Sequence, residues 1–249
     1  MAGTIIYLEG ITVSFNGFKA INGLSLYVDY DELRFLIGPN GAGKTTLLDV
    51  ICGRVKPAKG RVIFKEDIDI YEKQEHEIVR LGISRKFQTP AVFASLTVFE
   101  NIELSLRQNR GVFASLFAKF TSEDEDIIYS HLETIGLDQK ARVKAGSLAH
   151  GEKQWLEIGM LLAQDPELLL LDEPVAGMTK KETEKTGELF QAIAKSRSVL
   201  VVEHDMEFVR NFAKRVTVMN EGNILCEGTM ERIQNDPKVI EAYLGRGWK

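Results

Sequence analysis

The chain has 249 residues, enough for one large domain or two small ones, and its 44% apolar and 27% charged residues are typical of a folded globular protein. The net charge of −5 does not favour nucleic acid as a partner, because proteins that bind phosphate backbones usually carry an excess of basic residues. Since no apolar run approaches the roughly 20 residues that span a bilayer, the sequence predicts no membrane-spanning helix.

The N-terminal part is predicted to begin with short β-strands. Ile11 to Phe15 and Leu24 to Val28 alternate apolar and polar residues. The pairs Asn16-Gly17 and Asn22-Gly23 have the composition of turns, so we expect the first strand to end, and the second to begin, at a turn.

A short apolar strand, Arg34 to Ile37, leads into a glycine-rich stretch, and a helical pattern follows from Lys44 to Ile51. Another strand is predicted at Gly60 to Phe64. Residues 97–162 are predicted to be mostly helical. Within them, Ser122 and Glu125 have the spacing of a capping box ahead of a helical apolar stripe.

Three more strands are predicted in the last third of the chain, at residues 168–171, 198–202 and 216–219, with a helix at about 181–194 between the first two. Alternation of strand and helix implies parallel pairing. We therefore expect an α/β fold with an antiparallel β lobe at the N-terminus and a helical insertion. Because no interdomain linker is visible, residues 1–249 are predicted to form a single domain with a helical subdomain at about 89–162.

The stretch after the buried strand matches the phosphate-loop pattern G-x-x-x-x-G-K-[ST] at every fixed position. In this pattern the backbone N–H groups of a glycine-rich loop and a helix N-terminus face phosphate oxygens. Lys44 would contact the β and γ phosphates, and Thr45 would bind Mg²⁺. The core is therefore predicted to be a P-loop NTPase that binds ATP through Gly38, Pro39, Asn40, Gly41, Ala42, Gly43, Lys44, Thr45 and Thr46.

A second motif follows the run of four leucines that ends at Leu171. Asp172 and Glu173 come at the carboxyl end of this buried strand, where ligands bind in open α/β sheets. Asp172 is predicted to hold Mg²⁺ through its water shell, and Glu173 to orient or deprotonate the attacking water. Apolar strands often end in acidic residues, so this pair alone is a weak signal. The presence of the phosphate loop is what favours the nucleotide-binding interpretation.

The stretch Leu148-Ala-His-Gly-Glu-Lys-Gln resembles the signature motif of the ATP-binding-cassette family, usually Leu-Ser-Gly-Gly-Gln. The resemblance extends to a glutamine between the two nucleotide motifs (Gln88), a histidine after the following strand (His204) and an aromatic ahead of the phosphate loop (Phe15). It implies that Phe15 stacks on adenine, Gln88 contacts Mg²⁺ or water, and His204 reaches the γ-phosphate. Phe15 could instead be a core aromatic, His204 a backbone-bonded histidine, and Gln88 a surface amide.

In this family the signature of one copy faces the γ-phosphate held by another. The resemblance therefore implies that Ala149, His150, Gly151 and Glu152 bind nucleotide across a pair of ATP-binding subunits, formed with itself or a paralogue. Three departures weaken this expectation. Ala149 stands where the family has serine, Glu152 where it has glutamine, and Thr179 where an aspartate usually crosses the dimer axis.

Within the family, the chain resembles the ATP-binding subunits of urea importers and of branched-chain amino-acid importers. Leu148 to Met160 and Gln234 to Gly245 look most like the urea branch. The resemblance implies an ATPase on the cytoplasmic face of the membrane, with transmembrane permease subunits as partners and an extracytoplasmic solute-binding protein acting indirectly. Phe113, Phe117 and Phe120 fall near one helical face that would contact the permease or pack inside the helical insertion. A cassette ATPase outside transport and a nucleotide-binding regulator without turnover are the alternatives.

Overall fold

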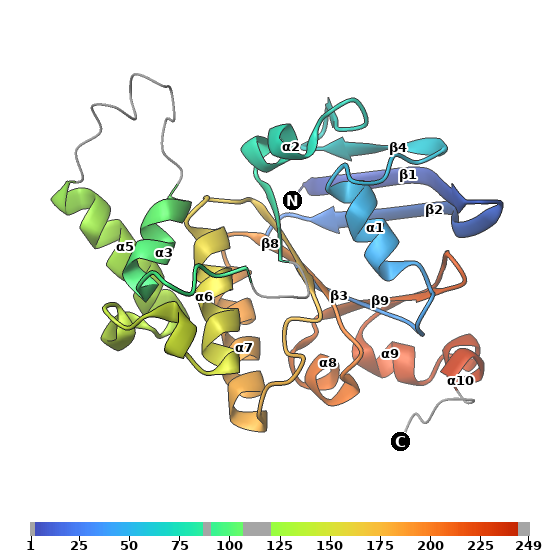
Figure 1. The fold of residues 1–249 in the computed structure, drawn as a ribbon. Coiled ribbons are helices and arrows are strands. Elements are labelled where there is room, and N and C mark those ends of the chain that lie inside the picture. Colours follow the sequence, from blue (N-terminus) through green and yellow to red (C-terminus); the bar gives the residue numbers. More distant parts are fainter. Residues whose placement is uncertain (1–2, 87–90, 107–120, 244–249) are drawn as a thin grey trace.

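Two β-sheets form the centre of the molecule, and the computed structural model describes residues 3–86, 91–106 and 121–243 (Figure 1). The first sheet is antiparallel, in the order β2 (Phe18–Asp29), β1 (Thr4–Phe15), β4 (Lys59–Phe64) and β5 (Ile68–Asp69). The second has the order β10 (Asn223–Gly228), β9 (Arg215–Asn220), β3 (Leu33–Ile37), β8 (Ser198–Val202), β7 (Leu168–Asp172) and β6 (Ile83–Lys86). Its strands are parallel except for β10. This arrangement confirms the α/β class and the antiparallel N-terminal lobe.

The prediction of a turn at Asn22-Gly23 is wrong. These residues lie inside β2, and the pairing with β1 shifts register between Ile11↔Leu24 and Thr12↔Asn22. Gly23 has φ +69 and donates its N–H to the Thr12 hydroxyl, so it forms a bulge rather than a chain reversal. The hairpin therefore runs without a break from Asn16-Gly17 to Asp29, and it places Phe15 opposite Phe18.

The central strands of the second sheet are buried on both faces, which explains why their sequences are continuously apolar. Alternate side chains of each strand enter different cores. On β7, Leu169 and Leu171 join a core shared with helices, while Leu168 and Leu170 join a core shared with the antiparallel sheet. Helices thus cover one face of the parallel sheet, and the β lobe covers the other (Figure 1).

The core on the helical face of the parallel sheet contains helices that come after β6 or after β7 in the chain. Those between β6 and β7 form the helical side of the molecule in Figure 1. They are α3 (Val98–Ser105), α5 (Ser122–Ile135) and α6 (His150–Leu162), and the later ones are α7 (Lys180–Ile193), α8 (Met206–Phe212), α9 (Met230–Gln234) and α10 (Pro237–Tyr243). The other core contains α1 (Lys44–Ile51) and α2 (Glu75–Leu81). The division into one domain with a subdomain at about 89–162 stays a prediction.

The capping box of α5 lies one residue earlier than predicted. Thr121, rather than Ser122, is the N-cap residue, and its hydroxyl accepts the Asp124 N–H. Asp124, rather than Glu125, accepts the Thr121 N–H in return. Aspartate completes the box as well as glutamate does here, and Ser122 becomes the first helical residue.

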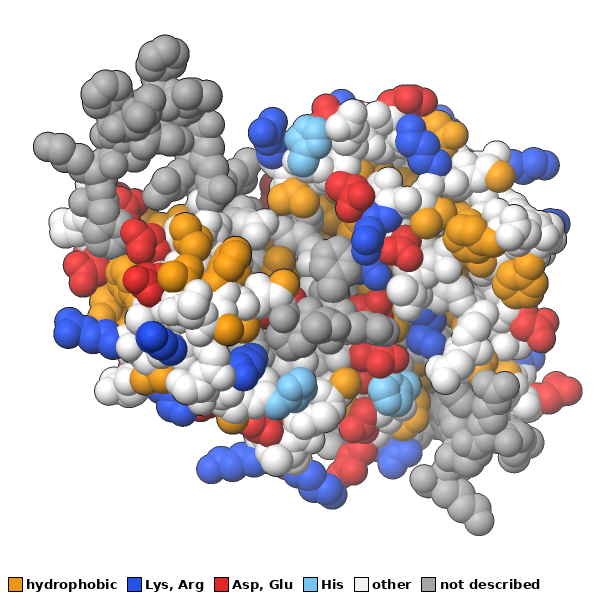
Figure 2. Space-filling model, in the orientation of Figure 1, with side chains coloured by type: hydrophobic (Ala, Val, Ile, Leu, Met, Phe, Trp, Pro, Cys, Tyr) orange, Lys and Arg blue, Asp and Glu red, His pale blue; other side chains and the backbone are white. Residues whose placement is uncertain are grey.

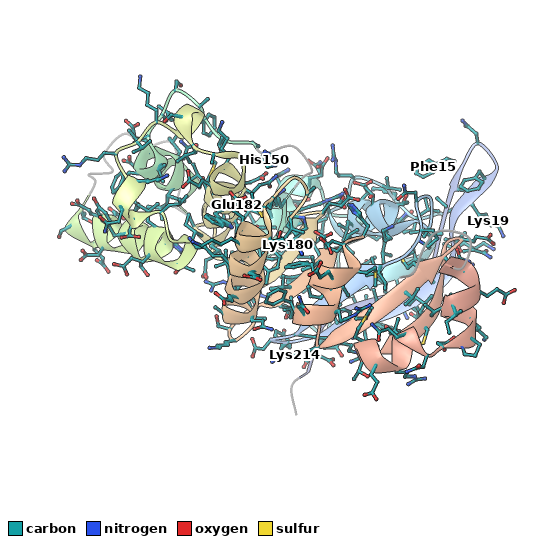
Figure 3. The ribbon with its side chains drawn as sticks, turned by 90° about the horizontal axis from the view of Figure 1, so that it is seen from below. Phe15, Lys19, His150, Lys180, Glu182 and Lys214 are labelled. Carbon is teal, nitrogen blue, oxygen red and sulfur yellow. The ribbon has the colours of Figure 1, made fainter. Side chains whose placement is uncertain are left out.

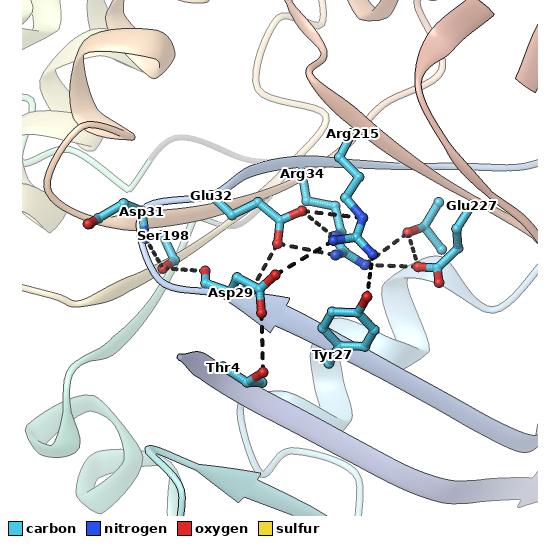
Figure 4. A network of polar contacts seen from close by, with 10 residues as sticks. Thr4, Tyr27, Asp29, Asp31, Glu32, Arg34, Ser198, Arg215 and Glu227 are labelled. Atoms are coloured by element: carbon cyan, nitrogen blue, oxygen red, sulfur yellow. Dashed lines mark hydrogen bonds and ion pairs between the residues drawn. The ribbon is translucent and has the colours of Figure 1, made fainter. Parts of the chain in front are cut away.

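A network of charged and polar residues around the buried Arg34 joins the two sheets (Figure 4). Arg34, on β3, is fully buried and pairs with Glu32 at 2.9 Å and with Glu227 of β10 at 2.8 Å. Arg215 of β9 donates to the Tyr27 hydroxyl of β2 at 2.6 Å. Because β2, β3, β9 and β10 each contribute a side chain to these contacts, the network fixes the β lobe against the parallel sheet.

The surface carries both signs of charge. On the face drawn in Figure 2, acidic and basic side chains are interspersed over the described residues. This matches a net charge of only −5.

Candidate functional site

The phosphate loop has the shape that its sequence predicts. It follows β3 and ends at Gly43, the N-cap of α1. A side chain at Gly38 would collide with the Met219 carbonyl oxygen, and a Cβ at Gly43 (φ +99) would lie 2.6 Å from the Ala20 carbonyl oxygen. Only glycine fits at these two places, and the loop can wrap closely because they carry no side chain.

Lys44 is the first residue of α1, and its ammonium group points back into the loop. It donates to the carbonyl oxygens of Gly38 (2.7 Å) and Pro39 (3.1 Å). Burial lowers the pKa of Lys44, while the nearby carboxylates of Glu173 and Asp172 act in the opposite direction. A partly desolvated cation therefore lies at a helix N-terminus, which is where an anionic ligand binds well.

An open cavity of about 440 Å³ lies over the loop. Its volume is in the range of small-molecule sites, roughly 300–1,000 Å³. Two aromatic rings of the β1–β2 hairpin, Phe15 and Phe18, stand at this cavity and are 48% and 69% exposed, so Phe15 is not a core aromatic. Phe18 was not predicted as a site residue. It lies three residues after Phe15 in the sequence, and only the hairpin places the two residues opposite each other. The lining residues are Phe15, Phe18, Ala20, Asn40, Gly41, Ala42, Gly43, Lys44, Thr45, Thr46 and Glu173.

Asp172 ends β7, directly before the cavity-lining Glu173, and is 2% exposed. Its Oδ2 accepts a hydrogen bond from Arg85 Nη2 at 3.1 Å, and Arg85 also pairs with Asp49 of α1 at 2.6 Å. Burial raises the pKa of Asp172, and Arg85 opposes that shift. Its Oδ1 is buried without a hydrogen-bond partner among the described residues. Arg85 is a site residue that the sequence did not single out, because its partners lie far away in the chain.

Glu173 follows in an unusual backbone conformation. Its φ is +47, in the left-handed region that non-glycine residues occupy at a cost of about 1–3 kcal/mol. Its side chain lines the cavity, and its Oε1 lies 3.3 Å from His204 Nδ1. The two predicted residues are thus brought together at the carboxyl ends of the neighbouring strands β7 and β8. Strain of this kind is common at functional sites.

The predicted signature residues begin α6, as expected. Ala149 is the N-cap and, lacking a hydroxyl, makes no side-chain cap, while Glu152 accepts the Ala149 N–H at 3.1 Å. His150 donates from Nε2 to the Ala176 carbonyl oxygen at 3.1 Å, and thus contacts the loop after Glu173.

This end of α6 is remote from the cavity. None of Ala149, His150, Gly151 and Glu152, all within the described residues, lines it. In Figure 3, His150 and Phe15 lie on well-separated parts of the molecule. One chain therefore does not bring its own signature to its own phosphate loop.

Two predictions fall outside the described residues. Gln88 lies in the segment 87–90, and Phe113, Phe117 and Phe120 lie in the segment 107–120. Within the described ranges, no cluster of three or more His, Cys, Asp or Glu side chains has the arrangement of a metal site. None of the helices in these ranges has the length and apolar character needed to cross a membrane.

Comparison with known proteins gives two family matches. Residues 21–176 match the model described as ABC transporter, and residues 223–249 match the model described as branched-chain amino acid ATP-binding cassette transporter. The chain is 37% identical to the high-affinity branched-chain amino acid transport ATP-binding protein LivG of Escherichia coli (strain K12), over 98% of this chain and 99% of LivG.

Solved structures agree with the fold. The ADP conformation of MJ1267, an ATP-binding cassette of an ABC transporter, superposes with a TM-score of 0.85 at 34% identity, covering 98% of this chain and 99% of MJ1267. The dimeric post-hydrolysis state of the cassette MJ0796, bound to ADP and Pi, has a TM-score of 0.76 at 25% identity, covering 90% of this chain and 98% of MJ0796.

Proposed function

The chain belongs to the ABC transporter family as an ATP-binding subunit, and from this we propose that it hydrolyses Mg-ATP in the cavity over the phosphate loop to power import of a branched-chain amino acid. Members of the family are ATPases that drive transport, and they act as pairs with transmembrane permeases. The observation that carries the proposal is the contact of Glu173 with His204 beside a cavity lined by the phosphate loop.

Each residue around the cavity has a role in this proposal. The loop N–H groups and Lys44 bind the β and γ phosphates, and Lys44 exchanges its bonds to Gly38 and Pro39 for bonds to phosphate oxygens. Phe15 and Phe18 contact the adenine. Glu173 orients and deprotonates the attacking water, and His204 donates a hydrogen bond to the γ-phosphate.

The residues present fit a Mg²⁺ ion. In phosphate sites Mg²⁺ is held by one or two protein oxygens together with phosphates and water, so a full protein cage is not needed. The buried Oδ1 of Asp172 offers an unused acceptor for a Mg²⁺-bound water, and the Thr45 hydroxyl a direct ligand. When bound, the ion neutralises charge on the phosphate oxygens. We assign the same ion a contact with Gln88.

We infer that two chains complete each site. The signature residues Ala149 to Glu152 stand away from their own cavity, and the related cassette MJ0796 is dimeric. A second copy, or a paralogue, would place its α6 N-terminus at the γ-phosphate. We further propose that the pair lies against permease subunits at the cytoplasmic face of the membrane and is supplied by an extracytoplasmic solute-binding protein.

For the solute, relatives support branched-chain amino acids ahead of urea. LivG is a branched-chain amino acid transport protein, and the C-terminal match has the same description. The predicted preference for urea or short-chain amides rests only on the resemblance of Leu148 to Met160 and Gln234 to Gly245, and the comparisons favour the alternative.

Reconstitution tests the proposal. The chain would be assembled in vesicles with its permease subunits, and labelled leucine or labelled urea would be offered with the matching binding protein. We expect ATP-dependent uptake of leucine and none with Lys44→Ala, because that chain lacks the loop cation. Uptake of urea without uptake of leucine would overturn the assignment of the solute. ATP hydrolysis without uptake of either solute would overturn the proposed role in their transport.

A further inference from the structure

We propose that the buried carboxylate of Glu203 is a positioning residue for ATP hydrolysis, because it holds the loop that carries Glu173 against the loop that carries His204. This inference rests on the proposed function of those two residues. Glu203 directly precedes His204, at the end of β8, and is 1% exposed. It does not line the cavity, so it acts through its neighbours rather than on substrate.

The carboxylate accepts backbone hydrogen bonds from both loops. Its Oε2 accepts from the N–H groups of His204 (3.1 Å) and Asp205 (3.4 Å), in the loop after β8. Its Oε1 accepts from the Val175 N–H (3.3 Å), in the loop after β7. One side chain thus joins two segments that are far apart in the sequence.

The two loops need such a connection because the sheet ends just before them. The pairing of β7 with β8 runs as far as Asp172 and Val202, and the Glu173 N–H then donates to the Val202 carbonyl oxygen at 2.9 Å. Beyond that bond, the chain after Glu173 turns away through a left-handed residue. A strained residue keeps its conformation only when its surroundings fix it, and the hydrogen bond that the Val175 N–H donates to Glu203 supplies a fixed point two residues later.

A charged group in this position is costly. Burial raises the pKa of Glu203, and the three backbone N–H groups and His204 act against that shift. The four residues of β8 that precede it, from Val199 to Val202, are apolar and equally buried. Carboxylates are seldom buried without a specific task, and here the task is the pairing of the two loops at the site.

Two substitutions test the bridge. Glu203→Asp keeps the charge and can keep the local bonds to the His204 and Asp205 N–H groups, as short carboxylates do in Asx turns, but it is too short to reach Val175 as well. Glu203→Gln keeps the length but replaces one acceptor oxygen with an NH₂ group, so one loop loses its partner. Glu100→Gln is the matched control, because Glu100 also accepts a backbone N–H, from Thr97, at the start of α3.

Steady-state ATPase would be measured on the full chain, together with equilibrium binding of Mg-ATP and thermal unfolding. We expect kcat to fall on the order of ten- to a hundredfold in both Glu203 variants, with KM and ATP affinity retained and unfolding still cooperative. Glu100→Gln should keep the wild-type kcat. Wild-type kcat in either Glu203 variant would overturn the proposal, as would a rise in KM at unchanged kcat. If Glu173→Gln itself turned over normally, the proposed roles at the site would fail instead.

Discussion

Oε1 of Glu173 and Nδ1 of His204 lie 3.3 Å apart at the ends of two neighbouring strands. This contact uses one ring nitrogen and leaves Nε2 for a substrate. With Nδ1 bonded to the carboxylate, Nε2 donates to a phosphate oxygen only when the ring carries both protons. In the proposed reaction the two side chains would act as one unit, with the carboxylate shared between the histidine and the attacking water.

Glu173→Gln should bind Mg-ATP with near-normal affinity and lower kcat by a factor on the order of 10²–10⁴, because the amide cannot accept the proton of the water. ATP-bound dimers should accumulate and be visible by light scattering. Since Glu173 and His204 form a unit, adding His204→Ala should lower kcat much less than it does alone. Normal turnover with no ATP-driven dimer would show that Glu173 is not the base.

Phe18→Ala should weaken ATP binding by about 1–3 kcal/mol, the range measured for stacking of a base on an aromatic ring. The ring stands at the cavity beside Phe15 and is largely exposed. Isothermal titration with Mg-ATP measures the loss, and Mg-triphosphate provides the control because it has no base. Equal losses for both ligands would mean that Phe18 supports the loop rather than the adenine.

Ala149→Ser should stabilise the nucleotide-free chain by about 1 kcal/mol, because a serine at this N-cap can accept the Glu152 N–H and complete a capping box. Urea unfolding measures this effect. The same hydroxyl should tighten ATP-driven dimerisation if the signature contacts a second copy's nucleotide. A gain in stability with unchanged dimerisation would restrict the role of residue 149 to its own helix.

Arg34→Met should lower the free energy of unfolding by up to about 3 kcal/mol, because it removes the close cation of Glu227 and leaves Glu32 with only the longer contact to Arg215 at 3.8 Å. Arg61→Met, which breaks the exposed pair of Arg61 with Glu9 on the β lobe, is the matched control and should change stability little. Similar losses in the two variants would contradict the role of the network in fixing the lobes.

The raised pKa of Glu203 gives a pH dependence with a defined sign. Because burial makes the folded state hold this proton more tightly than the unfolded state, stability is lost as pH rises from the ordinary glutamate value, about 4.3, through the folded pKa. Glu203→Gln removes this titration. Relative to the variant, the wild type should therefore be less stable at pH 8 than below the unfolded glutamate pKa, at about pH 3.5, in urea unfolding, and a constant difference would contradict the shift.

The phosphate loop could be predicted from sequence because all of its determinants are contiguous. Strand β6 could not, since Arg85 and Lys86 make Ile83–Lys86 look like surface. They are buried because Asp49, Asp172 and Glu157, from three other elements, face them.

The same limit applies to the site. Arg85 and Glu203 acquire a role only through partners that the fold brings together. The residues next to Arg85 and Glu203 in the sequence resemble those around many charged residues that are exposed to solvent. The turn expected at Asn22-Gly23 failed for a related reason, since a bulge and a turn use the same residues and only the pairing with β1 distinguishes them.

The separation of the α6 N-terminus from the hairpin of Phe15 has a genetic consequence. In the proposed pair of chains, each composite site would take its phosphate loop from one copy and its signature from the other. A Lys44→Ala chain and a Gly151→Asp chain should each be inactive alone, because both sites of a like pair would be defective. In a mixed pair, both lesions fall in one site and the other site is intact. Co-expression of the two inactive alleles should therefore restore part of the transport, whereas a chain carrying both lesions should rescue neither allele.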